Sequence, residues 1–207
     1  MTIEQKIKNN LPVTIGVISD THIPDRYPSF HPDFFEQIRA FPIDELWHAG
    51  DISSPRVIRQ LEQEFTVKAV RGNRDWLFGQ KLPLIYQCDI YGNTIALMHG
   101  HGGLYYYLID KVKFLFSGYN SNRYRLSMKK IAPDAQVVVF GHTHFQLNEW
   151  KEKRLLFNPG SVNETSDKRP GQSFGILRFF PNGEVEGEIV RMRKAKWIKR
   201  QWVINEN

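Results

Sequence analysis

The sequence predicts an α/β fold that is α+β in part, with a single domain over residues 1–190 and a basic C-terminal extension at 191–207. Two patterns indicate this class. Strands and helices alternate early in the chain, whereas its last part consists of short strands separated by turns. With 207 residues, 41% of them hydrophobic and 24% charged, the chain can bury a core and amounts to little more than one domain of roughly 150 residues.

The first half of the chain supplies three predicted strands with helices between them. Residues 13–19 are apolar and β-branched, which is the pattern of a strand buried on both faces. Ser54 before Pro55 is typical of a helix N-cap with proline at the first helical position. The elements expected here are strands at 13–19, 44–48 and 66–70, and helices at 33–41 and from Ser54 to about Glu64.

The second half is expected to contain more strands than helices. Residues 104–131 are rich in aromatic and basic side chains, and Ser117 and Gly118 divide them into two predicted helices. The strands after Phe140 are predicted to follow one another as a meander, around one or two packed sheets. The strands expected are 85–91 paired with 94–98, a buried strand at 136–140, and then 145–150, 154–158, 174–180 and 184–191.

Polar clusters follow these strands, and five of the seven histidines lie in them. Because ligands of open α/β sheets bind outside the carboxyl ends of the strands, we expect the clusters to converge on one pocket. His48 is expected in the core or behind a ligand, and His31 at the surface. The residues expected to converge are Asp20, His22, Asp51, Asn73, His99, His101, His142 and His144.

This mixture of imidazoles and carboxylates predicts a metal site. Such ligands suit manganese, iron, cobalt, nickel and zinc, and the all-oxygen cage that calcium requires is absent from the set. Seven or more ligands exceed the needs of one ion, so we expect two ions that share a carboxylate, with Asp51 as the bridge. Gly50-Asp51 alone is a weak signal, because both are ordinary turn residues, whereas His142-Thr143-His144 is stronger, because alternate residues of an extended segment face the same side. Five clusters, each at a strand end, are a specific pattern.

The ordered clusters resemble the calcineurin-like metallophosphoesterase superfamily and, within it, the small bacterial and archaeal phosphodiesterases. The resemblance covers about residues 13–188 and includes the later Asn158-Pro159-Gly160-Ser161. It implies two packed, mixed β-sheets flanked by helices. The motifs that carry it are Asp20-Thr21-His22, Gly50-Asp51, Gly72-Asn73-Arg74-Asp75, His99-Gly100-His101 and Gly141-His142-Thr143-His144.

Carried over position by position, the resemblance implies two divalent metal ions. Manganese is expected first, with iron, nickel, cobalt and zinc as alternatives. The two ions, roughly 4 Å apart, would polarise phosphoryl oxygens and lower the pKa of a bridging water, whose hydroxide attacks phosphorus. The ligands implied are Asp20, His22, Asp51 and His144 for one ion, and Asp51, Asn73, His99 and His142 for the other.

The expected activity is therefore that of a phosphodiesterase or phosphatase acting on a small-molecule phosphate ester. Asp51, Asn73, Arg74 and His101 are the residues expected to serve catalysis. Many relatives have histidine where this chain has Arg74, and arginine cannot protonate a leaving group because its pKa lies above about 12. Arg74 is expected either to clamp phosphate oxygens or to pair with Asp75 or another carboxylate at the rim, and His101 is the candidate acid.

Two other functions compete with this reading. A eukaryotic retromer subunit of similar fold works chiefly in assembly, so a protein-binding scaffold is the alternative, although no predicted ligand is replaced here by an inert residue. The net charge of +6 suggests nucleic acid. However, +5 of it lies in residues 191–207, which carry six basic residues and one acidic residue, so a nucleic-acid substrate is disfavoured.

The remaining expectations concern location and assembly. Cys88 is the single cysteine, and it cannot form an internal disulfide, which favours a reducing compartment. We find no signal-peptide pattern and no membrane-spanning run of apolar residues. The sequence therefore predicts a cytoplasmic protein, with a homo-oligomer as an open alternative to a monomer.

Overall fold

The computed structural model describes residues 1–76, 81–100 and 130–204. Most elements lie where the sequence predicts them, with boundaries that differ by up to three residues. None of the helices in these ranges is long and apolar enough to cross a membrane. The elements are α1 (Ile3–Lys8), β1 (Val13–Ile18), α2 (Phe34–Arg39), β2 (Glu45–His48), α3 (Pro55–Leu61), β3 (Val67–Ala69), β4 (Ile85–Ile90), β5 (Asn93–Met98), β6 (Val137–Val139), β7 (Leu147–Lys151), β8 (Arg154–Asn158), β9 (Ser173–Phe179), β10 (Val185–Arg191), β11 (Ala195–Ile198) and β12 (Gln201–Ile204).

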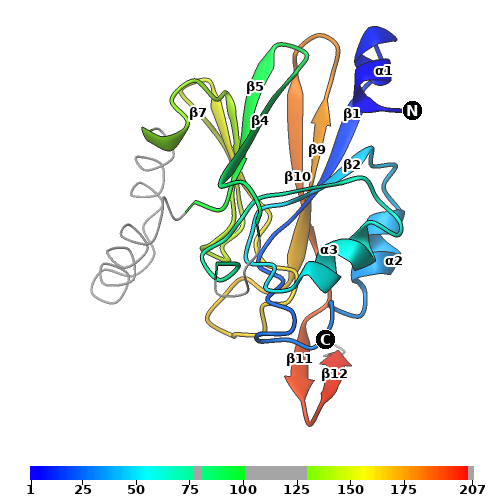
Figure 1. The fold of residues 1–207 in the computed structure, drawn as a ribbon, viewed down its shortest axis with the longest axis vertical. Coiled ribbons are helices and arrows are strands. Elements are labelled where there is room, and N and C mark those ends of the chain that lie inside the picture. Colours follow the sequence, from blue (N-terminus) through cyan, green and yellow to red (C-terminus); the bar gives the residue numbers. More distant parts are fainter. Residues whose placement is uncertain (77–80, 101–129, 205–207) are drawn as a thin grey trace.

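Two mixed five-stranded sheets pack face to face and form an α/β sandwich (Figure 1). The first has the order β10-β9-β1-β2-β3, with β1, β2 and β3 parallel. The second has the order β4-β5-β6-β8-β7, with β5, β6 and β8 parallel. Both sheets bury alternate side chains between them, as the two-residue period of a strand requires. The fold class predicted from the sequence is confirmed.

The core between the sheets is made by side chains from both of them. Ile15 and Val17 of β1 belong to the same buried cluster as Leu97 of β5 and Val139 of β6. Phe157 of β8 lies opposite, against the first sheet, where a Cβ atom on Gly175 would collide with its ring. This close packing fixes the relative position of the strand ends that carry the polar clusters.

The helices α2 and α3 cover the outer face of the first sheet (Figure 1). Phe34 and Ile38 of α2 and Leu61 of α3 are buried in a second apolar cluster with Leu46 of β2. The helix α3 begins as predicted, because the Ser54 hydroxyl accepts a hydrogen bond from the Arg56 amide and Pro55 occupies the first turn. The helices predicted within 104–131 lie almost wholly outside the described residues.

The prediction of one meander after Phe140 was wrong. Strands β7 and β8 form a hairpin in the second sheet, whereas β9 and β10 form a hairpin in the first. Each hairpin has the turn pattern and alternation that the sequence shows, but these local signals do not say which sheet a hairpin joins. The segment from Asn158 to Ser173 therefore crosses from one sheet to the other, and it passes the strand ends on its way.

The end of the chain forms a separate two-stranded hairpin, β11–β12, which projects from one end of the sandwich (Figure 1). Trp202 stacks on Tyr27 and donates its indole N–H to the Ser29 hydroxyl. Arg193, just before the hairpin, forms a two-point ion pair with Asp33. The basic segment is thus attached to the loop after β1, although its cations remain largely at the surface.

Candidate metal centre

The structure brings together all seven residues that the sequence predicts as metal ligands. Each follows a strand that belongs to a parallel pair, so the strand ends lie side by side at one edge of the sandwich. The residues come from both sheets. The first sheet supplies Asp20 and His22 after β1, Asp51 after β2 and Asn73 after β3, and the second supplies His99 after β5 and both His142 and His144 after β6.

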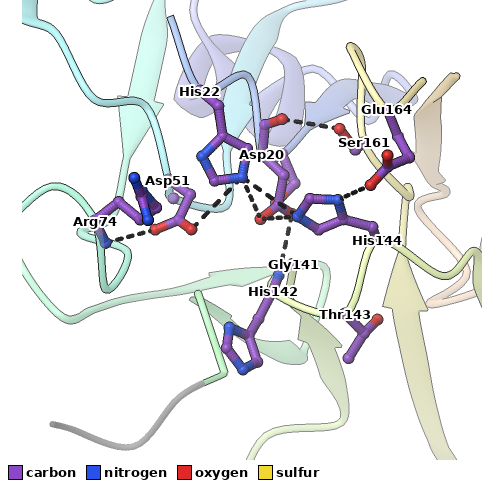
Figure 2. A network of polar contacts seen from close by, with 12 residues as sticks. Asp20, His22, Asp51, Arg74, Gly141, His142, Thr143, His144, Ser161 and Glu164 are labelled. Carbon is purple, nitrogen blue, oxygen red and sulfur yellow. Dashed lines mark hydrogen bonds and ion pairs between the residues drawn. The ribbon is translucent and has the colours of Figure 1, made fainter. Parts of the chain in front are cut away.

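One group of ligands consists of Asp20, His22 and His144 (Figure 2). The Asp20 Oδ1 atom lies 3.3 Å from Nε2 of His144 and 3.8 Å from Nε2 of His22. The two imidazole Nε2 atoms are 3.3 Å apart. The other oxygen of Asp20, Oδ2, accepts hydrogen bonds from the Ser19 hydroxyl at 2.5 Å and from the His142 amide at 3.0 Å. One carboxylate oxygen is therefore anchored and the other faces the imidazoles.

A second group consists of Asp20, Asp51 and His99. Asp51 Oδ1 lies 3.4 Å from Nε2 of His99, and Asp51 Oδ2 lies 3.7 Å from Nε2 of His22. The two oxygens of Asp51 thus face histidines of different groups. Asn73 joins this side, because its Oδ1 lies 3.1 Å from Nε2 of His99 and 3.2 Å from Nδ1 of His142.

The outer nitrogens of two of these rings are already occupied. His99 Nδ1 lies 2.7 Å from the carbonyl oxygen of Ala49, and His144 Nδ1 lies 2.5 Å from Oε2 of Glu164. Because both partners are acceptors, each ring keeps its Nδ1 proton, and Nε2 is the nitrogen that faces the centre and would bind a metal ion. Glu164 was missed by the sequence analysis, since it belongs to no motif and lies in a loop without periodicity.

The backbone at the site is strained. A non-glycine residue with positive φ is uncommon, and such residues cluster at functional sites where the surrounding structure holds them. Five of the seven predicted ligands lie in the left-handed region, with φ angles of 54° at Asp20, 50° at His22, 56° at Asp51, 69° at His142 and 59° at His144. The fold therefore fixes the direction of these side chains at a cost in backbone energy.

At two motif positions only glycine fits, because neighbouring atoms lie close to its backbone. A Cβ atom on Gly72 would collide with the amide and the carboxylate of Asp51, and one on Gly141 would collide with the Ser19 hydroxyl. The next residue of the third motif, Asp75, is fully buried and is also structural. Its carboxylate accepts the amide N–H groups of Asp51, Ile52, Ser53 and Gly72.

The pKa shifts show an electrostatic balance between buried carboxylates and imidazoles. Burial opposes protonation of His99 and His144, but the carboxylates of Asp51 and Asp20 outweigh it and raise both pKa values to about 9. Burial would raise the pKa of Asp20, yet the facing imidazoles hold it well below its usual value. Burial lowers the pKa of His22 to about 3, so this imidazole is neutral and able to coordinate.

Arg74 is paired with a carboxylate at the rim. Its Nη2 and Nε atoms lie 2.7 Å and 2.5 Å from the two oxygens of Asp25, and its amide donates to Asp51 Oδ1. The partner is thus Asp25, a carboxylate at the rim, and not Asp75. His101, the candidate acid, lies outside the described residues.

For the two histidines outside the motifs, the structure agrees with one expectation and corrects the other. His48 is fully buried and lies 3.1 Å from the Thr21 hydroxyl through Nε2, as expected for a core residue. The expectation that His31 lies at the surface was wrong, because only 1% of it is exposed. Its amide donates to Asn163 Oδ1, and its Nε2 lies 2.9 Å from the carbonyl oxygen of Arg193. The C-terminal segment and the loop after β8 cover it.

The donor set fits divalent metal ions. Within the part of the chain that the structure describes, the Asp20 Oδ1 atom is buried, accepts no hydrogen bond and lies 3.3 Å from Nε2 of His144, so a cation at this point would offset its charge. The convergent groups combine two carboxylates, an amide oxygen and four imidazoles without a thiolate, which is the chemistry of borderline divalent ions. The residues present therefore suit more than one ion.

Comparisons with known proteins give a family match and several relatives. A family model described as the calcineurin-like phosphoesterase superfamily domain matches residues 13–179. A probable metallophosphoesterase of Methanothermobacter thermautotrophicus is 32% identical over 86% of this chain and 91% of its own length. A phosphodiesterase of Methanocaldococcus jannaschii is 28% identical over 70% of this chain and 82% of its own length.

Among solved structures, vacuolar protein sorting 29 of Cryptosporidium parvum superposes with a TM-score of 0.65. The match covers 94% of this chain and 96% of that one, at 18% sequence identity. At this level of identity the likeness concerns the fold, and it agrees with the sandwich of two mixed sheets described above.

Proposed function

Because this chain belongs to the calcineurin-like phosphoesterase superfamily, whose members are metal-dependent phosphoesterases, we propose that it is a dinuclear phosphodiesterase. One observation carries the proposal: the two oxygens of Asp51 face His99 and His22, so one carboxylate lies between histidines of two ligand groups. The phosphodiesterase among its relatives supports the choice of bond, with phosphomonoesters as the second substrate class to be tested.

The two ions would be held by residues from both sheets. Asp20, His22, Asp51 and His144 would hold one ion, and Asp51, Asn73, His99 and His142 would hold the other. The two oxygens of Asp51, which face His99 and His22, support its role as the bridge. When bound, the cations supply an acidified water as nucleophile and neutralise the charge of the phosphoryl oxygens.

The chain's own groups orient this centre. Hydrogen bonds from Ser19 and the His142 amide fix the Asp20 carboxylate, and the Arg74 amide fixes that of Asp51. Because these donors are in place before substrate arrives, little reorganisation is required at the reacting phosphate. The Arg74 guanidinium pairs with Asp25 at the rim. This ion pair helps to hold the residue whose amide contacts Asp51.

The alternative, a protein-binding scaffold of the same fold, predicts a weakened ligand set. In this chain every predicted ligand is a competent residue, and the seven converge. Among the described residues, the buried Asp20 Oδ1 atom accepts no hydrogen bond and faces two imidazoles, which supports a site that binds a cation. These observations favour the enzyme.

The test is hydrolysis of bis-p-nitrophenyl phosphate and p-nitrophenyl phosphate by the full chain, with manganese, cobalt, zinc, nickel or iron added after chelation. We expect turnover of the diester that requires a divalent metal and is lost in Asp51→Ala. Asp134→Ala is a matched control, because Asp134 is exposed and precedes β6, whereas the ligands His142 and His144 follow that strand. Activity that survives chelation and Asp51→Ala would overturn the proposal, and an intact protein that binds no metal would favour the scaffold.

A further inference from the structure

The two inward-facing histidines with protonated Nδ1 atoms rest on different kinds of acceptor. Behind His99 lies a neutral backbone carbonyl, that of Ala49, at 2.7 Å. Behind His144 lies the carboxylate of Glu164, at 2.5 Å (Figure 2). Either acceptor fixes the ring orientation, but only the carboxylate adds a formal negative charge and raises the basicity of the coordinating nitrogen. The two halves of the centre therefore differ electrostatically.

Glu164 is held firmly enough to act as a fixed charge. Only 7% of it is exposed, and its second oxygen, Oε1, accepts the Ser166 amide at 2.9 Å. The preceding part of its loop is bound to the end of β1, because the Ser161 hydroxyl donates to the carbonyl of Asp20 and the Asn163 side chain donates to that of Thr21. The same loop thus positions Glu164 and contacts the backbone of a ligand.

We infer that Glu164 is a positioning residue that makes the Asp20–His22–His144 position the tighter of the two metal positions. This inference rests on the proposed function, because it assumes that two ions bind. Removing an outer carboxylate behind a metal-bound histidine typically weakens metal binding by roughly 10–100-fold. The outer nitrogen of His99 contacts the Ala49 carbonyl, so the position that contains His99 should not respond to Glu164.

The experiment is a calorimetric titration of the chelator-stripped full chain with Mn²⁺. We expect two steps for the wild type, and we expect Glu164→Gln to weaken the tighter step by roughly 10-fold or more while leaving the other within about three-fold. Glutamine keeps the shape and an acceptor oxygen, so the folded state should be preserved. Glu188→Gln is the matched control, since Glu188 is exposed and also forms an ion pair, with Arg178.

Double variants identify which of the two metal positions Glu164→Gln affects. Added to His99→Ala, Glu164→Gln should weaken the remaining Mn²⁺ step as it does in the wild type. Added to His144→Ala, it should have no further effect, because the ring through which it acts is gone. A purely structural role would change both backgrounds equally and would also lower the melting temperature of the metal-free protein.

The results separate the inference from the proposed function. If Glu164→Gln binds Mn²⁺ as the wild type does, or weakens both steps equally, the positioning role is overturned while the phosphodiesterase proposal stands. If the wild type itself binds no divalent metal, the proposed function fails and the inference fails with it.

Discussion

The Oδ1 atom of Asp20 lies 3.3 Å from Nε2 of His144 and, within the part of the chain that the structure describes, accepts no hydrogen bond. A buried anionic oxygen without a partner destabilises a fold unless a cation is present. Without a metal, that cation is the protonated His144 ring, because the Asp20 carboxylate helps to raise the pKa of His144 to about 9, and a bound metal ion would take the place of its Nε2 proton.

Asp20→Asn tests this relationship, because it removes the charge and keeps the shape. We expect Mn²⁺ to raise the melting temperature of the wild type and to leave that of the variant unchanged, since binding to the folded state alone stabilises it. Diester hydrolysis should fall by more than the roughly 10–100-fold that outer partners of metal sites contribute. An equal thermal shift in Asp20→Asn would contradict the assignment, and Asp134→Asn serves as the control.

A substitution of Arg74 separates the two roles considered for this residue, which are binding of phosphate oxygens and pairing with a carboxylate at the rim. Its fork is occupied by Asp25, so we expect Arg74→Gln to lower the free energy of unfolding by about 1 kcal/mol, as for a partly exposed ion pair. The KM for the diester should stay within about two-fold, and Asp25→Asn should behave in the same way. A large rise in KM for Arg74→Gln alone would show instead that the guanidinium clamps the phosphate.

The motif glycine Gly72 can be compared with a turn glycine, Gly92. A Cβ atom at Gly72 would displace Asp51, so Gly72→Ala should cost about 1–3 kcal/mol and weaken Mn²⁺ binding. Gly92 has a φ of 76° and open space around its Cβ position, so Gly92→Ala should cost about 1–2 kcal/mol and leave binding unchanged. Denaturation and metal titration of both variants check this, and normal binding by Gly72→Ala would contradict it.

The parts of the fold and site that the sequence predicts are those with local signals. The buried strand β1 is a continuous apolar run, and Ser54 with Pro55 marks the start of α3. The metal ligands could be predicted because each of them follows a strand. Neighbouring parallel strands bring their carboxyl ends to the same edge of the sheet. The packing of these strands then fixes distances that spacing along the chain does not contain.

The parts that the sequence does not predict depend on tertiary contacts. Glu164 reaches His144 because the segment after β8 crosses between the sheets, and the pattern of two hairpins is the same whichever sheet each one joins. The sequence leaves several carboxylates as possible partners of Arg74. Only the folded structure shows that the partner is Asp25. His31 precedes a proline in a polar loop, and its burial comes from Asn163 and Arg193, more than 130 residues away in the chain.

His31 also predicts a pH dependence of stability. Its Nδ1 accepts the Asp33 amide and its Nε2 faces the Arg193 carbonyl, so the folded protein holds it neutral. Burial lowers the pKa of His31 below the value of 6.5, and the opposing effect of the Asp33 carboxylate is smaller. The unfolded chain therefore binds this proton first, and stability falls as the pH drops below 6.5.

The measurement is chemical denaturation of the wild type and His31→Gln between pH 8 and pH 5. At pH 8 the variant should be less stable by about 1 kcal/mol, the value of a lost hydrogen bond. Below pH 6.5 the wild type should lose up to about 1.4 kcal/mol per pH unit more than the variant. The other buried histidines titrate in both proteins and cancel in the comparison. Parallel pH profiles would show that His31 is not held neutral by its burial.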